Sequence, residues 1–231
     1  EDLKDVLKFT QGLILISGPT GSGKTTTLYS ILKELNCDDK KIITVEDPIE
    51  YKIDSINQVP INNKVGLSFE LVLKNILRQD PDIIFIGEIR DKFSLDIALQ
   101  ASLTGHLVLA SIHSSSSVET ITRLIDLKAD PFLISTTLKA VMAQRLVLAH
   151  CKSCENGCKE CNFTKFYDRT SIAEILKIDE QISSLIFNKA SFNELKEYLK
   201  NINFKTILDD GKQKVKNSLT TLEEVYKVVN Y

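Results

Sequence analysis

The feature that most constrains this chain is the glycine-rich segment GPTGSGKTTT, which begins at Gly18 and follows the apolar run GLILIS. It fits G-x-x-x-x-G-K-[ST], the phosphate-binding loop (P-loop) between a buried strand and a helix. Glycines let backbone N–H groups curve around phosphates, and the next helix points its positive N-terminus at the same anion. The lysine neutralises phosphate charge, and the hydroxyl after it ligates Mg²⁺. The segment predicts a nucleoside triphosphate site, with Mg²⁺ on Thr25 and the phosphates among Gly18, Thr20, Gly21, Ser22, Gly23, Lys24, Thr25 and Thr26.

Apolar strand-like runs alternate with helical patterns along the first part of the chain. Strands are predicted at 12–17, 41–47, 82–88 and 106–113, and helices at 25–36, 69–79, 93–103 and 117–127. Because these strands are apolar throughout, the pattern favours an α/β fold whose mostly parallel sheet is covered on both faces. Segment 51–62 alternates apolar and polar residues and is interpreted as a peripheral hairpin. Residues from about 171 to 231 are interpreted as a small helical subdomain.

The composition is that of one large globular domain, or of one domain with a small appendage. The chain has 231 residues, of which 43% are hydrophobic. Its net charge of −2, from 29 basic and 31 acidic residues, predicts no general attraction to nucleic acid or to an anionic membrane. No apolar run approaches the roughly 20 residues that span a bilayer. The chain opens within a helical pattern, EDLKDVLKF, so we expect an N-terminal portion to be missing from it.

Acidic residues follow two of the predicted strands. Glu88 ends DIIFIGE, and a carboxylate at this end of a parallel strand lies where a P-loop holds phosphates, so it can bind Mg²⁺ through water. The segment VEDPIEY places three acids after another strand, and one of them is a candidate base for the attacking water. For Glu46 or Asp47, a helix cap or a turn around Pro48 explains the residue equally well.

Four of the five cysteines fall in the segment HCKSCENGCKECNF, with the spacing C-x₂-C-x₃-C-x₂-C. Two C-x-x-C pairs supply the four thiolates of a tetrahedral Zn²⁺ site, and a site with all four positions filled is structural. The predicted zinc ligands are Cys151, Cys154, Cys158 and Cys161. Disulfides, or His150 in place of one cysteine, are the alternatives. Cys37 is interpreted as a half-buried thiol.

Taken together, four segments resemble the secretion ATPases, the hexameric motors of type II secretion and type IV pilus assembly, including competence pseudopili. The segments are GPTGSGKTTTLYSIL, ITVEDPIEY, LRQDPDIIFIGEIRD and ASLTGHLVLASIHSSS, in the family's order and at similar intervals. The tail LDDGKQKVKNSLTTLEEVYKVV is also similar, with Ser218 where the family has a glycine. The resemblance covers essentially the whole chain as the C-terminal ATPase domain.

The resemblance implies a P-loop NTPase fold of the RecA-like type. We expect a P-loop ATPase core at 1–150, a tetracysteine zinc element at 151–170 and a C-terminal helical subdomain at 171–231, without the N-terminal domain of the full protein. Assembly and secretion motors often carry a tetracysteine element at this place, whereas the similar retraction motors lack it. The spacer between the cysteine pairs is shorter here than in the family.

The resemblance also implies roles for single residues. Glu50, the last acid of EDPIE, matches the general base, and Glu88 matches the Walker B glutamate. His106 and His113 match the His-box pair that reports on nucleotide state, although each alone is better explained as structural. Arg78 and Arg90 lie in the same block of sequence as Glu88. They are interpreted as contacts to phosphate or to a neighbouring subunit, or equally as members of surface ion pairs.

The function that the resemblance implies is Mg²⁺-dependent ATP hydrolysis by a homohexamer. The expected cofactors are ATP, Mg²⁺ and Zn²⁺, and the expected partner is the inner-membrane platform protein that adds pilin-like subunits, at the cytoplasmic face of the inner membrane. One alternative is a nucleotide-dependent switch or scaffold with negligible turnover. Another is a DNA-translocating motor, which the near-neutral charge does not favour, so we expect no nucleic-acid partner.

Overall fold

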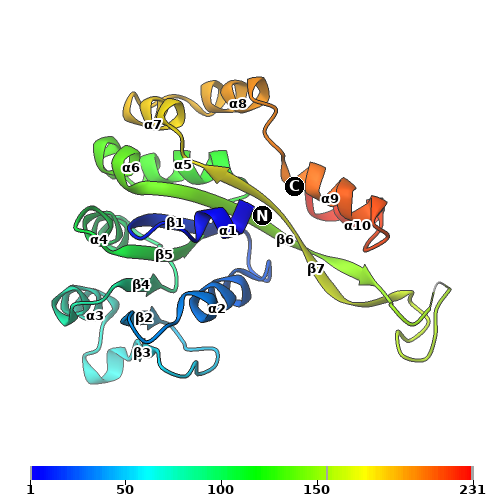
Figure 1. Cartoon of the computed structure of the whole chain (residues 1–231), viewed down its shortest axis with the longest axis horizontal. Coiled ribbons are helices and arrows are strands. Elements are labelled where there is room, and N and C mark those ends of the chain that lie inside the picture. The colour runs from blue at the N-terminus through cyan, green and yellow to red at the C-terminus, as the bar shows by residue number, and fades with distance from the viewer. Residues whose placement is uncertain (1, 155, 230–231) are drawn as a thin grey trace.

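The computed structural model describes residues 2–154 and 156–229. Its centre is a seven-stranded sheet with the order β3-β2-β4-β5-β1-β6-β7 (Figure 1). Neighbouring strands are parallel except for the antiparallel pair β6 and β7. The strands are β1 Gly12–Ser17, β2 Ile42–Glu46, β3 Asn57–Pro60, β4 Ile83–Ile86, β5 Leu107–Ile112, β6 Leu138–His150 and β7 Phe166–Lys177. The expected mostly parallel sheet is confirmed.

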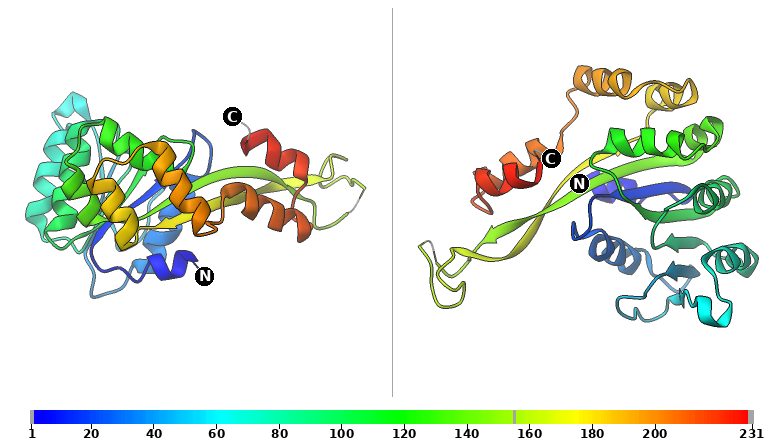
Figure 2. Two further views of the ribbon diagram at one scale, coloured as in Figure 1. Left: turned by 90° about the horizontal axis from the view of Figure 1, so that it is seen from above. Right: turned by 180° about the vertical axis from the view of Figure 1, so that it is seen from behind.

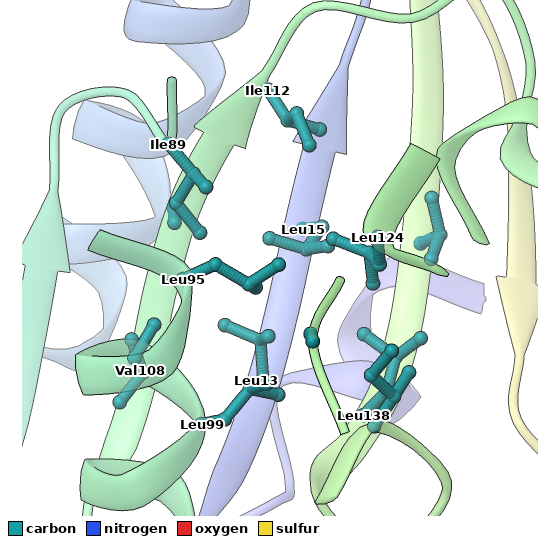
Figure 3. Packing of buried hydrophobic residues seen from close by; sticks show 14 of the residues in the cluster. Leu13, Leu15, Ile89, Leu95, Leu99, Val108, Ile112, Leu124 and Leu138 are labelled. Carbon is teal, nitrogen blue, oxygen red and sulfur yellow. The ribbon is translucent and has the colours of Figure 1, made fainter. Parts of the chain in front are cut away.

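The central strands are apolar throughout because helices cover both of their faces. Alternate side chains of β1 enter different cores, since successive residues of a strand point to opposite faces. Leu13 and Leu15 belong to a core with residues of the helices α3 (Phe69–Ile76), α4 (Lys92–Leu103), α5 (Ser117–Asp126) and α6 (Pro131–Thr137). Ile14 and Ile16 belong to a core with residues of α1 (Asp2–Val6) and α2 (Lys24–Leu35). Figure 3 shows Leu13 and Leu15 in the first of these cores.

The helices begin at residues that can cap them. Asp91 forms a capping box with Ser94 at the start of α4, and Pro131 occupies the first turn of α6 after the cap Asp130. No helix among residues 2–154 and 156–229 has both the length and the apolar composition that crossing a bilayer needs. The α-helices are α1 Asp2–Val6, α2 Lys24–Leu35, α3 Phe69–Ile76, α4 Lys92–Leu103, α5 Ser117–Asp126, α6 Pro131–Thr137, α7 Glu180–Phe187, α8 Phe192–Asn201, α9 Ile207–Lys216 and α10 Leu222–Val229; 3₁₀ turns lie at Asn63–Val65 and Leu77–Gln79.

Strands β6 and β7 continue beyond the rest of the sheet as a twisted two-stranded arm (Figures 1 and 2). The loop with the four cysteines lies at the far end of this arm, between the two strands. Helices α9 and α10 pack against the arm through a small apolar core that includes Val147, Ile172, Ile207 and Val225. The arm therefore connects the sheet to the cysteine loop.

Two expectations about the chain's organisation were wrong. Segment 51–62 is no hairpin, because its only strand, β3, pairs in parallel with β2. The C-terminal region does not begin as helix at residue 171, because β7 continues to Lys177 and pairs along β6. The first helix after it begins at Glu180. Ser218, which stands where the family resemblance leads us to expect a glycine, adopts a left-handed backbone with φ of 55°.

Candidate functional site: a phosphate loop and a cysteine cluster

The phosphate loop joins β1 to α2, and two of its glycines lie against β6. At Gly18, with φ of 153°, a Cβ atom would lie 2.4 Å from Ser22 Oγ and 2.6 Å from the Gln144 carbonyl oxygen. At Gly23, with φ of 85°, a Cβ atom would lie 2.8 Å from Gln144 Nε2. Both positions therefore require glycine, for space as well as for backbone conformation.

The P-loop lysine lies folded over its own loop. Lys24 Nζ donates to the carbonyl oxygens of Gly18 at 2.8 Å and Pro19 at 2.9 Å. Burial lowers the pKa of Lys24, an effect that nearby Glu88 opposes and nearby Arg145 adds to. A phosphate oxygen can replace these carbonyl oxygens as the acceptor, which is the role that the sequence predicts for this lysine.

A cavity of about 950 Å³ opens beside the loop at the carboxyl ends of β1, β2, β4 and β5. Such an edge of a parallel sheet is where nucleotides bind in folds of this class. Gly18, His106 and Arg78 are not among the residues that line it. The predicted site residues that do line it are Thr20, Gly21, Ser22, Gly23, Lys24, Thr25, Thr26, Glu50, Glu88 and His113, together with Arg90.

Glu88 lies at the centre of a small charged cluster just after β4. Its carboxylate accepts from Arg90 Nε at 2.5 Å and contacts His113 Nε2 at 2.6 Å. The contact with Glu88 raises the pKa of Arg90. Arg90 is therefore part of an ion pair at the exposed side of the cavity, and a surface ion pair is one of the three roles considered for it. Glu88 stands on the same edge as Lys24 and Thr25, where a carboxylate can hold a hydrated Mg²⁺.

The structure distinguishes two of the acids in VEDPIEY. Glu46 is buried at the end of β2, where its carboxylate accepts from Tyr29 Oη, from Thr44 Oγ1 at 2.6 Å and from Gln58 Nε2 at 3.1 Å. Glu50 is exposed, lines the cavity, and has no side-chain hydrogen bond among those found in the described part of the chain. The Glu46 carboxylate is thus occupied by hydrogen bonds from its neighbours, whereas the Glu50 carboxylate is available to a water molecule.

The two histidines of the expected His-box pair lie at opposite ends of β5. His113 follows the strand and meets Glu88, as described above. His106 precedes the strand, and its Nδ1 lies 2.9 Å from the Ala101 carbonyl oxygen and 3.2 Å from Thr104 Oγ1. With about 3.3 Å of rise per residue, about 23 Å of extended chain separates the two residues. The structure brings His113, but not His106, to the cavity.

Gln144 on β6 is a residue that the sequence analysis did not identify. Its buried amide donates from Nε2 to the Ser22 carbonyl oxygen at 2.8 Å and accepts from Thr27 Oγ1 at 2.8 Å. The next residue, Arg145, donates to the Gln144 carbonyl oxygen at 2.9 Å and to that of Ser115 at 2.8 Å. Hydrogen bonds from β6 therefore help to fix the conformation of the phosphate loop, in addition to the glycines of the loop itself.

The four cysteines of the arm converge on one point. Their sulfur atoms all lie within 4.8 Å of one another, with separations of 3.9 Å for Cys151–Cys158, 3.5 Å for Cys154–Cys161 and 3.8 Å for Cys158–Cys161. Four sulfurs at about 2.3 Å from a tetrahedral zinc ion lie about 3.8 Å apart. The donor set and its spacing therefore fit the predicted structural Zn²⁺.

The surroundings of the cluster favour the thiolate form at Cys161, whereas burial and the neighbouring thiols raise the pKa of Cys154. The Cys158 N–H donates to Cys161 Sγ at 3.2 Å and lowers the pKa of that thiol to about 6. His150, the alternative ligand, stacks on Phe166 and places its Nδ1 2.9 Å from the Ser218 carbonyl oxygen. Cys37 lies apart from the cluster and is exposed, where a half-buried thiol was expected.

A phosphate loop between a buried strand and a helix, at the carboxyl edge of a parallel sheet, defines a P-loop nucleotide-binding protein. The family model described as "Type II/IV secretion system protein" matches residues 1–227. The chain therefore belongs to the family of type II/IV secretion system proteins, as the four segments predicted.

Several named relatives agree with this assignment. The chain is 42% identical over 235 residues to the type II secretion system protein HxcR of Pseudomonas aeruginosa, covering 98% of this chain and 50% of that protein. It is 41% identical to the type II secretion system ATPase E of Vibrio cholerae, with 99% and 50% covered. It is 40% identical to the type IV pilus assembly ATPase PilB of Thermus thermophilus, with 97% and 28% covered. The chain thus spans about half the length, or less, of these relatives.

Solved structures confirm the fold. The pilus retraction motor PilT with bound ADP superposes with a TM-score of 0.82 at 30% identity, over 99% of this chain and 64% of that one. The ATPase DotB of Legionella pneumophila gives a TM-score of 0.78 at 26% identity, over 99% and 63%. The P-loop NTPase fold predicted from the sequence is therefore shown.

Proposed function

We propose that this chain is the ATPase domain of a motor that drives the assembly of a pilus or pseudopilus in type II secretion, type IV pilus biogenesis or competence. The observation that carries the proposal is the grouping of Lys24, Thr25, Glu50 and Glu88 around one cavity. Relatives named as secretion and pilus-assembly ATPases support it. At least half of the length of each of these relatives lies outside the region of similarity.

In the proposed reaction, the residues of the cavity position ATP and a water molecule. Loop N–H groups and Lys24 hold the β- and γ-phosphates, while Thr25 and Glu88 face the metal position, directly and through water respectively. Mg²⁺, when bound there, would supply positive charge that offsets the charge of the phosphates. The Glu50 carboxylate takes a proton from water as the water oxygen attacks the γ-phosphorus. The bond from phosphorus to the bridging oxygen breaks, which leaves ADP and inorganic phosphate.

His113 would report on the nucleotide. Its ring contacts Glu88, so a change in the metal or phosphate next to Glu88 alters the position that the ring prefers. We propose the same sensing role for His106, as the family resemblance implies, but through β5, because its ring lies away from the cavity. The zinc site would stabilise the arm and take no part in hydrolysis.

The motor would act as a homohexamer on an inner-membrane platform protein, at the cytoplasmic face of that membrane. These elements rest on the family resemblance, and the family match and a relative named as a type II secretion ATPase support only the motor itself. A nucleotide-dependent switch with negligible turnover is the alternative to a motor. A DNA-translocating motor would require DNA-stimulated turnover, which the net charge of −2 does not favour.

The deciding experiment compares phosphate release by the full-length protein and by its Glu50→Gln variant. The variant keeps the size of the side chain and loses the base, so we expect turnover to fall by about 100-fold or more while binding of a non-hydrolysable ATP analogue persists. Glu70→Gln, on the exposed face of α3, is the matched control and should keep wild-type turnover. Equal phosphate release by wild type and Glu50→Gln would contradict the motor.

A further inference from the structure

Tyr29 lies between two acids of the VEDPIEY segment. It belongs to α2, the helix that begins with the P-loop lysine, and its side chain is fully buried. The hydroxyl donates to the Glu46 carboxylate and accepts from the Glu50 N–H at 3.3 Å. One hydroxyl group thus links the buried acid at the end of β2 to the exposed acid that faces the cavity.

The Glu46 end of this link is fixed. Thr44 and Gln58 both donate to Glu46 Oε1, which leaves Oε2 for the tyrosine. Gln58 also accepts from the Ile53 N–H at 2.7 Å, so the same network includes the chain just after Glu50. A buried carboxylate with several donors holds its orientation firmly, because losing any donor leaves a buried charge less well satisfied.

The Tyr29 end is fixed as well. The ring makes edge-to-face contacts with Tyr51 at 4.6 Å and Phe85 at 6.1 Å between centroids. Burial and the adjacent Glu46 carboxylate raise the pKa of Tyr29, so its hydroxyl stays protonated and donates to that carboxylate. A hydroxyl that donates to a carboxylate is also a better acceptor, which strengthens the bond from the Glu50 N–H.

We infer that Tyr29 is a positioning residue for hydrolysis, which fixes the backbone of Glu50 relative to the phosphate loop through the Tyr29–Glu46 pair. The inference rests on the proposed function, in which Glu50 is the base. Tyr29 and Lys24 belong to the same helix, so one rigid element sets both the position of the base, Glu50, and the position of the phosphate. A displacement of a general base by about 1 Å can lower a rate by about 100-fold.

The test is Tyr29→Phe in the full-length protein, which removes the hydroxyl and keeps the ring. We expect kcat to fall between about 10- and 100-fold. The Kd for a non-hydrolysable ATP analogue should stay within about twofold, because the phosphate loop is untouched. Amide hydrogen exchange at Glu50 should become faster, since its N–H loses its acceptor.

The matched control is Tyr198→Phe on α8, which likewise removes a tyrosine hydroxyl that donates to a carboxylate, Asp179 Oδ2 at 2.8 Å. It should leave kcat unchanged. Should Tyr29→Phe give no folded protein, Glu46→Gln makes the same test, because it weakens the anchor and retains the hydroxyl.

The outcomes separate this inference from the proposed function. A reduced kcat with an unchanged Kd supports the positioning role. A wild-type kcat in Tyr29→Phe, or a loss of kcat that only follows a lower melting temperature and a weaker Kd, overturns it. If the wild-type protein hydrolyses no ATP, or Glu50→Gln hydrolyses it normally, the proposed function itself fails.

Discussion

The side chain of Gln144 donates to the carbonyl oxygen of Ser22 over 2.8 Å, although the two residues are 122 positions apart in the chain. The same amide accepts from Thr27, on the far side of the loop. Ser22 belongs to the phosphate loop and Thr27 to the helix after it, so Gln144 spans the junction at which the loop must keep its shape. Its burial excludes water as a substitute partner.

We therefore expect Gln144→Glu to weaken ATP binding. The substitution keeps the shape of the side chain but turns a carboxylate oxygen toward the Ser22 carbonyl oxygen, which repels it. The Kd for a fluorescent ATP analogue should rise about tenfold or more, equivalent to about 1.4 kcal/mol. Gln100→Glu, on the exposed side of α4, should leave the Kd unchanged. An unaltered affinity in Gln144→Glu would show that the loop keeps its shape without this residue.

The cysteine cluster predicts one zinc ion per chain, measurable by elemental analysis of the purified protein. Chelation should lower the melting temperature by about 4–8 °C, the shift for about 2 kcal/mol in a chain of this size. Cys158→Ser should lose the metal and show a similar shift, whereas Cys37→Ser should do neither, because Cys37 is exposed and outside the cluster. Full stability without metal, or disulfides among the four cysteines, would count against the zinc site.

Gly211 in α9 predicts a defect confined to the C-terminal helices. A Cβ atom there would lie 2.5 Å from Cγ1 of the fully buried Val225 on α10. Gly211→Ala should therefore destabilise the protein by about 1–3 kcal/mol, measured by urea denaturation. The neighbouring exposed Lys212→Ala serves as the control. Nucleotide affinity should be unchanged in both variants, and wild-type stability in Gly211→Ala would mean that α10 shifts at no cost.

Glu174 on β7 joins the starts of two helices. Its buried carboxylate accepts from the Ser117 N–H and Oγ, both at 2.7 Å, and from the Ile207 N–H at 3.1 Å. Glu174→Gln retains one acceptor oxygen and loses the charge that favours helix N-termini. We expect a loss of about 2 kcal/mol in the free energy of unfolding, against no change for Glu197→Gln on the exposed side of α8. A stability within experimental error of wild type would show that another group caps both helices.

The parts of the fold that sequence analysis predicted well are those with local signals. Strand β1, the glycine-rich loop and α2 follow one another, so their identity is readable within a single stretch of chain. The cysteine cluster was predicted for the same reason, because its spacing is short and specific. Strand β7 was missed because Asp168, Arg169 and Thr170 give its first half a polar character, and this part lies on the arm.

The residues that sequence analysis missed act across long separations. Nothing near Gln144 in the sequence indicates that its amide meets Ser22 and Thr27, and nothing near Tyr29 indicates its link to Glu46 and Glu50. These contacts depend on which strands become neighbours in the sheet. A match to a family motif does not fix a residue's position either. His106 matches such a motif, but it lies at the edge of the sheet opposite the cavity.

Gln144, at the phosphate loop, belongs to β6, and Cys151, in the cysteine cluster, directly follows the end of this strand. About 23 Å of extended chain separates the two residues. Since β7 pairs along most of β6, the two-stranded arm bends less readily than a single strand would. A tilt of about 10° near Gln144 would move the cysteine tip by about 4 Å. A change in strand direction near Gln144 would therefore be larger at the cysteine loop, at the far end of the arm.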